Sequence, residues 1–199
     1  MVVGIAGKYC AGKNTVSRIL EQHGYQMIDV DKLGHQALSR KKEEIAARFG
    51  ELILTAEGDV DRKRLGEIVF ENPEARRDLE EILHPAMVSM VEEEISRDAA
   101  TRKIINAALL FPMKLDRLCD RVLWVTAPLF VRVKRAWRRD HLPLPRIVQR
   151  MWSQRNLTPQ PSASDVDIHT VENPGNTALL VKQLGGLGLL KDGEEHGTA

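Results

Sequence analysis

A glycine pair followed by a lysine near the N-terminus has the spacing of a phosphate-binding loop. Gly7 is separated by four residues from Gly12-Lys13, between an apolar run at 2–6 and a helical apolar pattern that starts at Val16. In such a loop the backbone N–H groups converge on one point, and the lysine adds a full positive charge. The alternative is a glycine-rich turn with a chance lysine. The candidate nucleotide-binding residues are Gly7, Cys10, Ala11, Gly12, Lys13, Asn14 and Thr15.

Asn14 follows the lysine, at the position where a Ser or Thr hydroxyl normally binds Mg²⁺. Its side-chain carbonyl is also a hard oxygen donor, although it lies one bond further from the backbone. Thr15 does not simply substitute, because adjacent helical residues point about 100° apart. We therefore expect Asn14 to be the metal ligand, in a site whose Mg²⁺ binding is weakened.

Cys10 and Cys119 are the only cysteines, which excludes a disulfide framework and suits a reducing compartment. Cys10 lies in the candidate loop, close to a helix N-terminus and to Lys13, and both favour the thiolate. We expect Cys10 to be alkylated faster than Cys119.

Two aspartates follow the second short apolar run, Tyr25 to Ile28. In an extended chain residues i and i+2 point the same way, so Asp29 and Asp31 can face one site at the carboxyl edge of a sheet, where open α/β sheets bind ligands. A carboxylate there can accept or orient the proton of an attacking hydroxyl. The alternative is that Asp31 caps a helix beginning at Lys32.

Apolar runs alternate with helical patterns along the chain, which is typical of an α/β fold. Strands are expected at 2–6, 25–28, 103–110, 121–126 and 166–171. The third and fourth runs are almost continuously apolar, as strands buried on both faces are. The pattern predicts a central parallel sheet.

Residues 32–98 are expected to be helical throughout, which is too long for an ordinary crossover and indicates a substrate-binding insert. Within it, Asn72-Pro73 is expected to start a helix that runs up to His84-Pro85. A last helix is expected at 177–184, and the glycine-rich residues 185–199 are expected to form a flexible tail.

The window 131–155 is rich in basic residues and is divided by prolines into two expected helices. Three interpretations are open: nucleic-acid binding by arginines and tryptophans, an arginine-bearing lid that closes over a nucleoside triphosphate, or a solvated basic helix pair whose tryptophans pack in the core. The phosphate loop favours the lid. The residues concerned are Arg132, Lys134, Arg135, Arg138, Arg139, Arg146, Arg150, Arg155, Trp137 and Trp152.

The composition is that of an ordinary globular protein. The chain has 199 residues, 43% hydrophobic and 29% charged, with a formal net charge of +1. This balance gives no global attraction to nucleic acid or to membranes. No apolar run is long enough to cross a bilayer, so we expect a cytoplasmic protein with no membrane partner. The sequence carries no signal for an oligomeric state.

The order of these features resembles the dephospho-coenzyme A kinase family, P-loop kinases of the nucleoside-monophosphate-kinase type. The resemblance runs from about Val2 to Leu184. Its motifs are Ile28-Asp29-Val30-Asp31, Phe70-x-Asn72-Pro73-Glu74, Leu83-His84-Pro85, Leu109-Leu110-Phe111, the lid residues Lys134-Arg135, Arg139-Asp140, Arg150 and Gln154, and the loop Glu172-Asn173-Pro174-Gly175.

The resemblance implies a three-layer P-loop fold with a helical substrate-binding insert and a helical lid. It implies transfer of phosphate from ATP, with Mg²⁺, to the ribose 3′-hydroxyl of dephospho-coenzyme A, the two small-molecule partners. Asp31 would be the base, Lys13 and Arg139 would act on the phosphates, and Arg135 and Asn173 would bind nucleotide. Asp29, His84 and Leu109 would lie in the substrate region.

The implied organisation has a nucleotide-binding core at 1–31 and 99–184, an insert at 32–98, a lid at 131–155 and a tail at 185–199. The chain departs from the family pattern at five positions, which bear on the metal site and the substrate pocket. They are Lys8, Cys10, Asn14, Ala108 and Pro112. The competing hypotheses are a kinase of another small hydroxyl compound or nucleotide, and a nucleotide-binding relative without turnover.

Overall fold

The computed structural model describes residues 1–155, 157–161 and 166–190. The chain divides into two compact units, one made of residues 1–28 and 99–199 and the other of residues 29–98. We call the first the core unit and the second the helical unit, and we describe each by itself.

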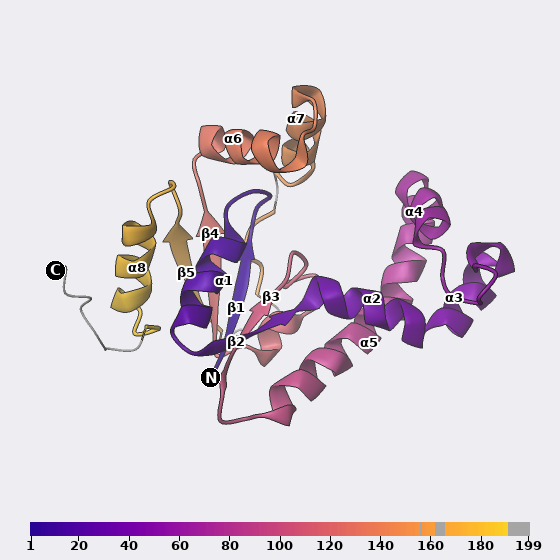
Figure 1. The fold of residues 1–199 in the computed structure, drawn as a ribbon, viewed down its shortest axis with the longest axis horizontal. Helices are drawn as coiled ribbons and strands as arrows, with labels where there is room; N and C mark the ends of the chain where they lie inside the picture. The colour runs from indigo at the N-terminus through magenta and orange to yellow at the C-terminus, as the bar shows by residue number, and fades with distance from the viewer. Residues whose placement is uncertain (156, 162–165, 191–199) are drawn as a thin grey trace. The chain divides into compact units, whose positions relative to one another are not determined.

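The core unit is built on a five-stranded sheet in the order β2-β3-β1-β4-β5 (Figure 1). The strands are β1 Val2–Gly7, β2 Tyr25–Asp29, β3 Arg102–Asn106, β4 Arg121–Thr126 and β5 Asp167–Glu172. β1 pairs in parallel with β3 and β4, and β4 pairs in parallel with β5. The predicted α/β class with a central parallel sheet is confirmed.

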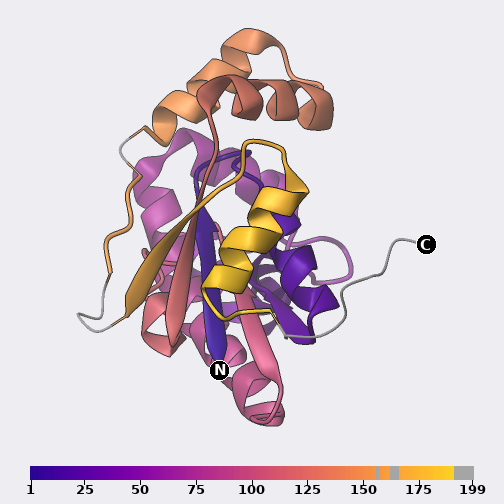
Figure 2. The same cartoon turned by 90° about the vertical axis from the view of Figure 1, so that its left-hand side faces the viewer.

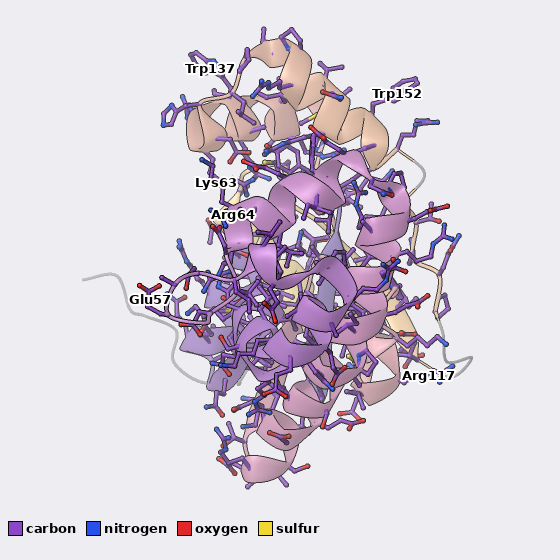
Figure 3. The ribbon with its side chains drawn as sticks, turned by 90° about the vertical axis from the view of Figure 1, so that its right-hand side faces the viewer. Glu57, Lys63, Arg64, Arg117, Trp137 and Trp152 are labelled. Carbon is purple, nitrogen blue, oxygen red and sulfur yellow. The ribbon has the colours of Figure 1, made fainter. Side chains whose placement is uncertain are left out.

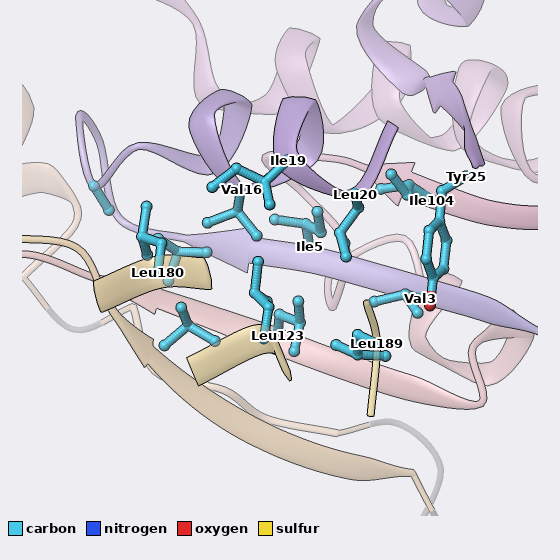
Figure 4. Close-up of a cluster of buried hydrophobic side chains, with 14 residues drawn as sticks. Val3, Ile5, Val16, Ile19, Leu20, Tyr25, Ile104, Leu123, Leu180 and Leu189 are labelled. Carbon is cyan, nitrogen blue, oxygen red and sulfur yellow. The ribbon is translucent and has the colours of Figure 1, made fainter. Parts of the chain in front are cut away.

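Two helices cover one face of this sheet, α1 (Lys13–Gln22) and α8 (Thr177–Gly186). Alternate residues of β1, Val3 and Ile5, are fully buried on this face with Leu20 of α1 and Leu180 of α8 (Figure 4). Figure 2 shows α8 in front of the sheet. Apolar residues that recur every second position in the strand and about every 3.6 positions in the helices thus pack together in one core.

On the opposite face of the sheet, the strand expected at 103–110 is shorter than predicted. β3 ends at Asn106, and residues 108–114 form turns that lead into the 3₁₀ helix η2 (Leu115–Leu118). The apolar run continues past the strand because Leu110 and Phe111 are buried. The ring of Phe111 lies 6.2 Å from that of Trp124 in β4. The apolar run therefore belongs partly to the strand and partly to turns that pack on the sheet, and a sequence pattern does not separate the two.

The basic window forms the two predicted helices, α6 (Leu129–Asp140) and α7 (Leu144–Ser153), which we call the lid helices. They lie beyond the carboxyl ends of β1 and β4 (Figures 1 and 2). Their small core contains Ala136, Ile147 and Met151. Trp137 and Trp152 project into solvent, 59% and 65% exposed (Figure 3), so the interpretation that they pack in the core was wrong.

The helical unit is centred on the buried side chains Ile45, Ile53 and Leu65. Its elements are α2 Val30–Arg40, α3 Lys42–Phe49, the 3₁₀ helix η1 Glu51–Ile53, α4 Arg62–Glu71 and α5 Pro73–Arg97. None of the described helices in either unit is long and apolar enough to span a membrane.

The long helix α5 confirms one prediction and corrects another. The Asn72 side chain caps it, accepting from the N–H groups of Glu74 and Ala75, and Pro73 occupies its first turn. The helix does not end at Pro85 but continues to Arg97. Pro85 removes one backbone hydrogen bond, whereas the following turns bury Met90 and Val91, and that burial favours continuation.

The flexible tail expected at 185–199 was wrong for residues 185–190, the part of it that the structure describes. Leu189 is fully buried in the sheet core. Arg121 donates to the carbonyl of Leu187 at 2.8 Å, and Arg102 donates to that of Leu189 at 3.4 Å. Residues 185–190 are therefore part of the core unit, whereas 191–199 lie outside the described residues.

We predict that Leu189→Ala lowers the free energy of unfolding by about 2–5 kcal/mol, the usual range when a fully buried leucine is truncated. Urea denaturation followed by circular dichroism measures the change. Leu52→Ala is the matched control, because Leu52 is 84% exposed and its loss should cost less than about 0.5 kcal/mol. Equal stability of the two variants would mean that the segment after α8 does not contribute to the core.

Candidate active site

The phosphate loop connects β1 to α1, and close packing requires both of its fixed glycines. A Cβ at Gly7 would overlap the carbonyl oxygen of Val125 in the neighbouring strand. Gly12 has φ of 99°, in the left-handed region, and a Cβ there would overlap the side-chain amide of Asn173. The spacing of these glycines is therefore set by β4 on one side and by the loop after β5 on the other.

The N-terminus of α1 has the character of an anion site. Among the described residues no side chain caps it, and Gly12 holds the N-cap position. Uncapped N–H groups and the helix dipole attract anions. Lys13 is the first residue of α1, and its Nζ donates to the carbonyl of Gly7 at 3.2 Å. This holds the ammonium group over the loop.

A cavity of about 470 Å³ opens at this helix terminus. Three lid arginines, Arg135, Arg138 and Arg139, line it together with Lys13 and with Arg18 of α1. So many cations around one space, in a chain of net charge +1, are suited to a polyanion such as a triphosphate. The remaining lining residues are Cys10, Gly12, Asn14 and Thr15.

Arg135 and Asn173 join the loop, the lid and the segment after β5. The carbonyl of Ala11 accepts from Asn173 Nδ2 at 3.1 Å and from Arg135 Nη1 at 3.0 Å. Arg135 Nη2 donates to Asn173 Oδ1 at 2.9 Å. Asn173 is 1% exposed, and burial lowers the pKa of Arg135. The structure therefore places both expected nucleotide-binding residues at the loop, where they fix its shape.

Asn14 lies in the first turn of α1, and its side-chain oxygen faces the end of β3. Asn106 Nδ2 donates to Asn14 Oδ1 at 3.0 Å, which orients the amide and leaves the oxygen a second lone pair. The described residues contain no group of three or more His, Cys, Asp or Glu that could hold a metal ion. A single hard oxygen beside a phosphate site fits Mg²⁺, which proteins bind through few side chains together with phosphates and water.

The loop thiol differs from the expectation. Cys10 is 9% exposed and packs against the lid core, and this burial raises its pKa, although nearby Arg139 acts in the opposite direction. The expected stabilisation of the thiolate is outweighed by desolvation. The residue also has φ of 58°, a left-handed conformation in which glycine is unstrained. Cys10 therefore stands at a position where a glycine would fit without strain.

The two aspartates separate in role. Asp29 is the N-cap of α2, accepting from the N–H of Lys32 at 3.2 Å, and α2 begins at Val30. Asp31 is exposed in the first turn of that helix. The alternative that Asp31 caps a helix was therefore wrong: Asp29 is the cap, and Asp31 makes no capping bond.

The two remaining substrate candidates lie on different units. His84 is half-buried on α5 of the helical unit. Leu109 belongs to the turns after β3 in the core unit and is 42% exposed.

Sequence reasoning missed three residues of the core unit that contribute to the site. Arg18 carried no signal, because an arginine on a surface helix is ordinary. Asn106 ends a strand whose length was overestimated. Tyr9 lies between the two fixed glycines of the loop and carries no motif of its own, yet it contacts the lid through its backbone and its side chain.

We predict that alkylation of Cys10 is slow at neutral pH and accelerates as the pH rises, because its pKa is raised and the thiolate is the reactive form. Burial raises the pKa of Cys119 to about 12, so Cys119 should react more slowly still. ATP should protect Cys10, which lines the cavity. Mass spectrometry of the labelled peptides, with and without ATP, measures both rates. Equal rates that ignore ATP would contradict the placement of Cys10.

Comparisons with known proteins agree with this geometry. A sequence profile described as dephospho-CoA kinase matches residues 1–177. The dephospho-CoA kinase of Fusobacterium nucleatum subsp. nucleatum is 32% identical over 186 residues, covering 92% of this chain and 95% of that protein. That of Borreliella burgdorferi is 38% identical over 128 residues, 64% of this chain, and the match spans 62% of the relative's length.

A solved structure gives the same result. The dephospho-CoA kinase from Campylobacter jejuni superposes with a TM-score of 0.67 at 25% identity, covering 94% of this chain and 96% of that one. The resemblance seen in the motifs is confirmed, and the chain belongs to the dephospho-CoA kinase family.

Proposed function

We propose that this chain transfers a phosphoryl group from ATP to the ribose 3′-hydroxyl of dephospho-coenzyme A, giving coenzyme A and ADP. The observation that carries the proposal is the cation-lined cavity at the uncapped N-terminus of α1, in a chain of the dephospho-CoA kinase family. Membership of the family supports the choice of acceptor. The cavity supports the choice of a triphosphate donor.

Phosphoryl transfer depends on positioning and charge neutralisation more than on covalent catalysis. In our proposal the N–H groups at the start of α1 and the Lys13 ammonium bind the β- and γ-phosphates of ATP. Arg139, at the cavity wall, neutralises the charge that spreads over the transferred group. Arg135 and Asn173 hold the loop in shape and border the nucleotide.

Asn14 Oδ1 is the proposed protein ligand of Mg²⁺, held in orientation by Asn106. When bound, the ion would supply positive charge that neutralises the phosphates of the donor. The remaining ligands would be phosphate oxygens and water, as is usual for this cation.

The acceptor is proposed to bind through the helical unit, residues 29–98. Asp31 is the candidate base, because it is exposed and carries a carboxylate that no capping bond occupies. It would accept or orient the proton of the attacking hydroxyl. Asp29 fixes the start of the helix that carries Asp31, and His84 and Leu109 are proposed acceptor contacts. The reaction and the two free thiols accord with a cytoplasmic location.

Coupled measurement of ADP release tests the proposal directly. We expect release with dephospho-coenzyme A that greatly exceeds release with other nucleotides, nucleosides or small alcohols. A different preferred acceptor would make the chain a kinase of another hydroxyl compound. Binding of ATP without turnover on any acceptor would make it a nucleotide-binding relative.

We predict that Asp31→Asn lowers kcat by roughly two to four orders of magnitude, the usual contribution of general acid–base catalysis. The affinity for ATP, measured by calorimetry, should barely change. Asp59→Asn is the control, since Asp59 is an exposed aspartate of the same unit. Retention of most activity by Asp31→Asn would remove the proposed base.

We predict that Asn14→Ser lowers the Mg²⁺ concentration required for half-maximal rate, because a shorter oxygen donor suits octahedral Mg²⁺ better. Asn14→Ala, which supplies no oxygen, should raise that concentration. A Mg²⁺ titration of the three proteins at fixed ATP measures the order. Three superimposable curves would show that residue 14 does not contact the metal.

A further inference from the structure

Tyr9 links the phosphate loop to both lid helices. Its N–H donates to Gln154 Oε1 at 2.6 Å, just after α7. Its carbonyl accepts from Arg132 Nε of α6 at 2.8 Å. Its hydroxyl donates to Asp140, the last residue of α6. One loop residue therefore contacts the lid at three separate atoms.

The tyrosine ring also faces two lid arginines. The guanidinium carbon of Arg139 lies 5.3 Å from the ring centroid, and that of Arg150 lies 5.9 Å from it. Both distances are within the range of a cation–π interaction. The ring thus provides a surface on which two like charges lie close together.

Asp140 completes the arrangement from the lid side. It accepts from Arg139 Nε at 2.6 Å and Nη2 at 3.2 Å, and from Arg150 Nη1 at 3.4 Å. The bonds from Arg139 and then Tyr9 lower the pKa of Asp140 to about 2, so the carboxylate is ionised throughout the neutral range. Two guanidinium groups share this one carboxylate, so the cluster keeps an excess positive charge.

Of the two arginines that contact the Tyr9 ring, Arg139 is the one that lines the phosphate cavity. Arg139 lines the cavity with Lys13, although its side chain is 60% exposed and has many rotamers open to it. A flexible cation in solvent contributes little until it is fixed. The Tyr9 ring and the Asp140 carboxylate both contact the Arg139 guanidinium, and these contacts limit the positions that it can take.

From these contacts we propose that Tyr9 is a positioning residue for phosphoryl transfer: its ring and hydroxyl, acting with Asp140, hold Arg139 at the phosphate cavity. The proposal rests on the proposed function. It gives a residue between the two fixed glycines of the loop a role in the reaction, since the Tyr9 side chain determines where Arg139 lies when the γ-phosphate binds.

A double-mutant cycle tests the coupling. We expect Tyr9→Leu to lower kcat about 10- to 100-fold, the cost of misplacing a group by about an ångström, while KM for ATP changes less. Tyr9→Phe, which keeps the ring, should fall between Tyr9→Leu and the unaltered chain. In an Arg139→Ala background, Tyr9→Leu should change kcat by no more than about 2-fold.

Trp137→Leu is the matched control, because it removes an exposed aromatic side chain from α6, the helix that carries Arg139. It should alter kcat by less than about 2-fold. An equal loss from Tyr9→Leu with and without Arg139 would assign Tyr9 a purely structural role. A rise in kcat would mean that the contact restrains the lid, which also overturns the proposal. If Tyr9→Leu does not fold, Tyr9→Phe and Asp140→Asn complete the same cycle.

A second measurement does not depend on the acceptor. The Nε–Hε resonance of Arg139, assigned from Arg139→Lys, should be sharp in the unaltered chain and broadened in Tyr9→Leu. If no kinase activity is found but this NMR pattern is seen, the proposed function is wrong, whereas the positioning of Arg139 by Tyr9 is supported. Sharp signals in both proteins would overturn the positioning role, whatever the enzyme phosphorylates.

Discussion

The carbonyl oxygen of Ala11 is the point on which the shape of the phosphate loop depends. It receives hydrogen bonds from the buried amide of Asn173 and from the guanidinium of Arg135. These donors come from the segment after β5 and from the lid, so three distant parts of the chain meet at one atom. A buried polar group that loses its partner costs about 1–3 kcal/mol. The arrangement is therefore fixed, and it leaves no room for a Cβ at Gly12.

Electrostatics explains why the rest of the site needs this constraint. Lys13 and three lid arginines surround one cavity, and such a set of like charges repels itself unless an anion is present. Only fixed elements can hold them there. The loop supplies part of that support, since Tyr9 and Cys10 join the small core of the lid helices.

Much of the fold and the phosphate loop could be predicted from the sequence, because short-range rules determine them. The apolar runs gave β1, β2, β4 and β5, and the glycine spacing located the loop. The errors arose where tertiary packing decided. The run at 103–110 is apolar because turns, as well as the strand, cover a sheet face, and Leu189 is buried although its neighbours suggest a tail. Local composition does not distinguish these cases.

The site showed the same division. The sequence offered Asp31 as the possible helix cap, and only the backbone geometry shows that the cap is Asp29. The sequence pointed to Lys13 and a helix N-terminus beside the Cys10 thiol. In the structure the nearby positive charge that favours its thiolate is chiefly that of Arg139, and burial of the thiol outweighs it. The contacts of Tyr9 with Gln154 and Asp140 span well over a hundred positions, so no local pattern could predict them.

Phosphorus NMR of the reaction mixture tests the central claim most directly. The chain, ATP, Mg²⁺ and dephospho-coenzyme A should give one new phosphomonoester signal, coupled to the ribose 3′ proton, in equal amount to ADP. Formation of ADP without a phosphomonoester, or a phosphate on another hydroxyl, would contradict the account.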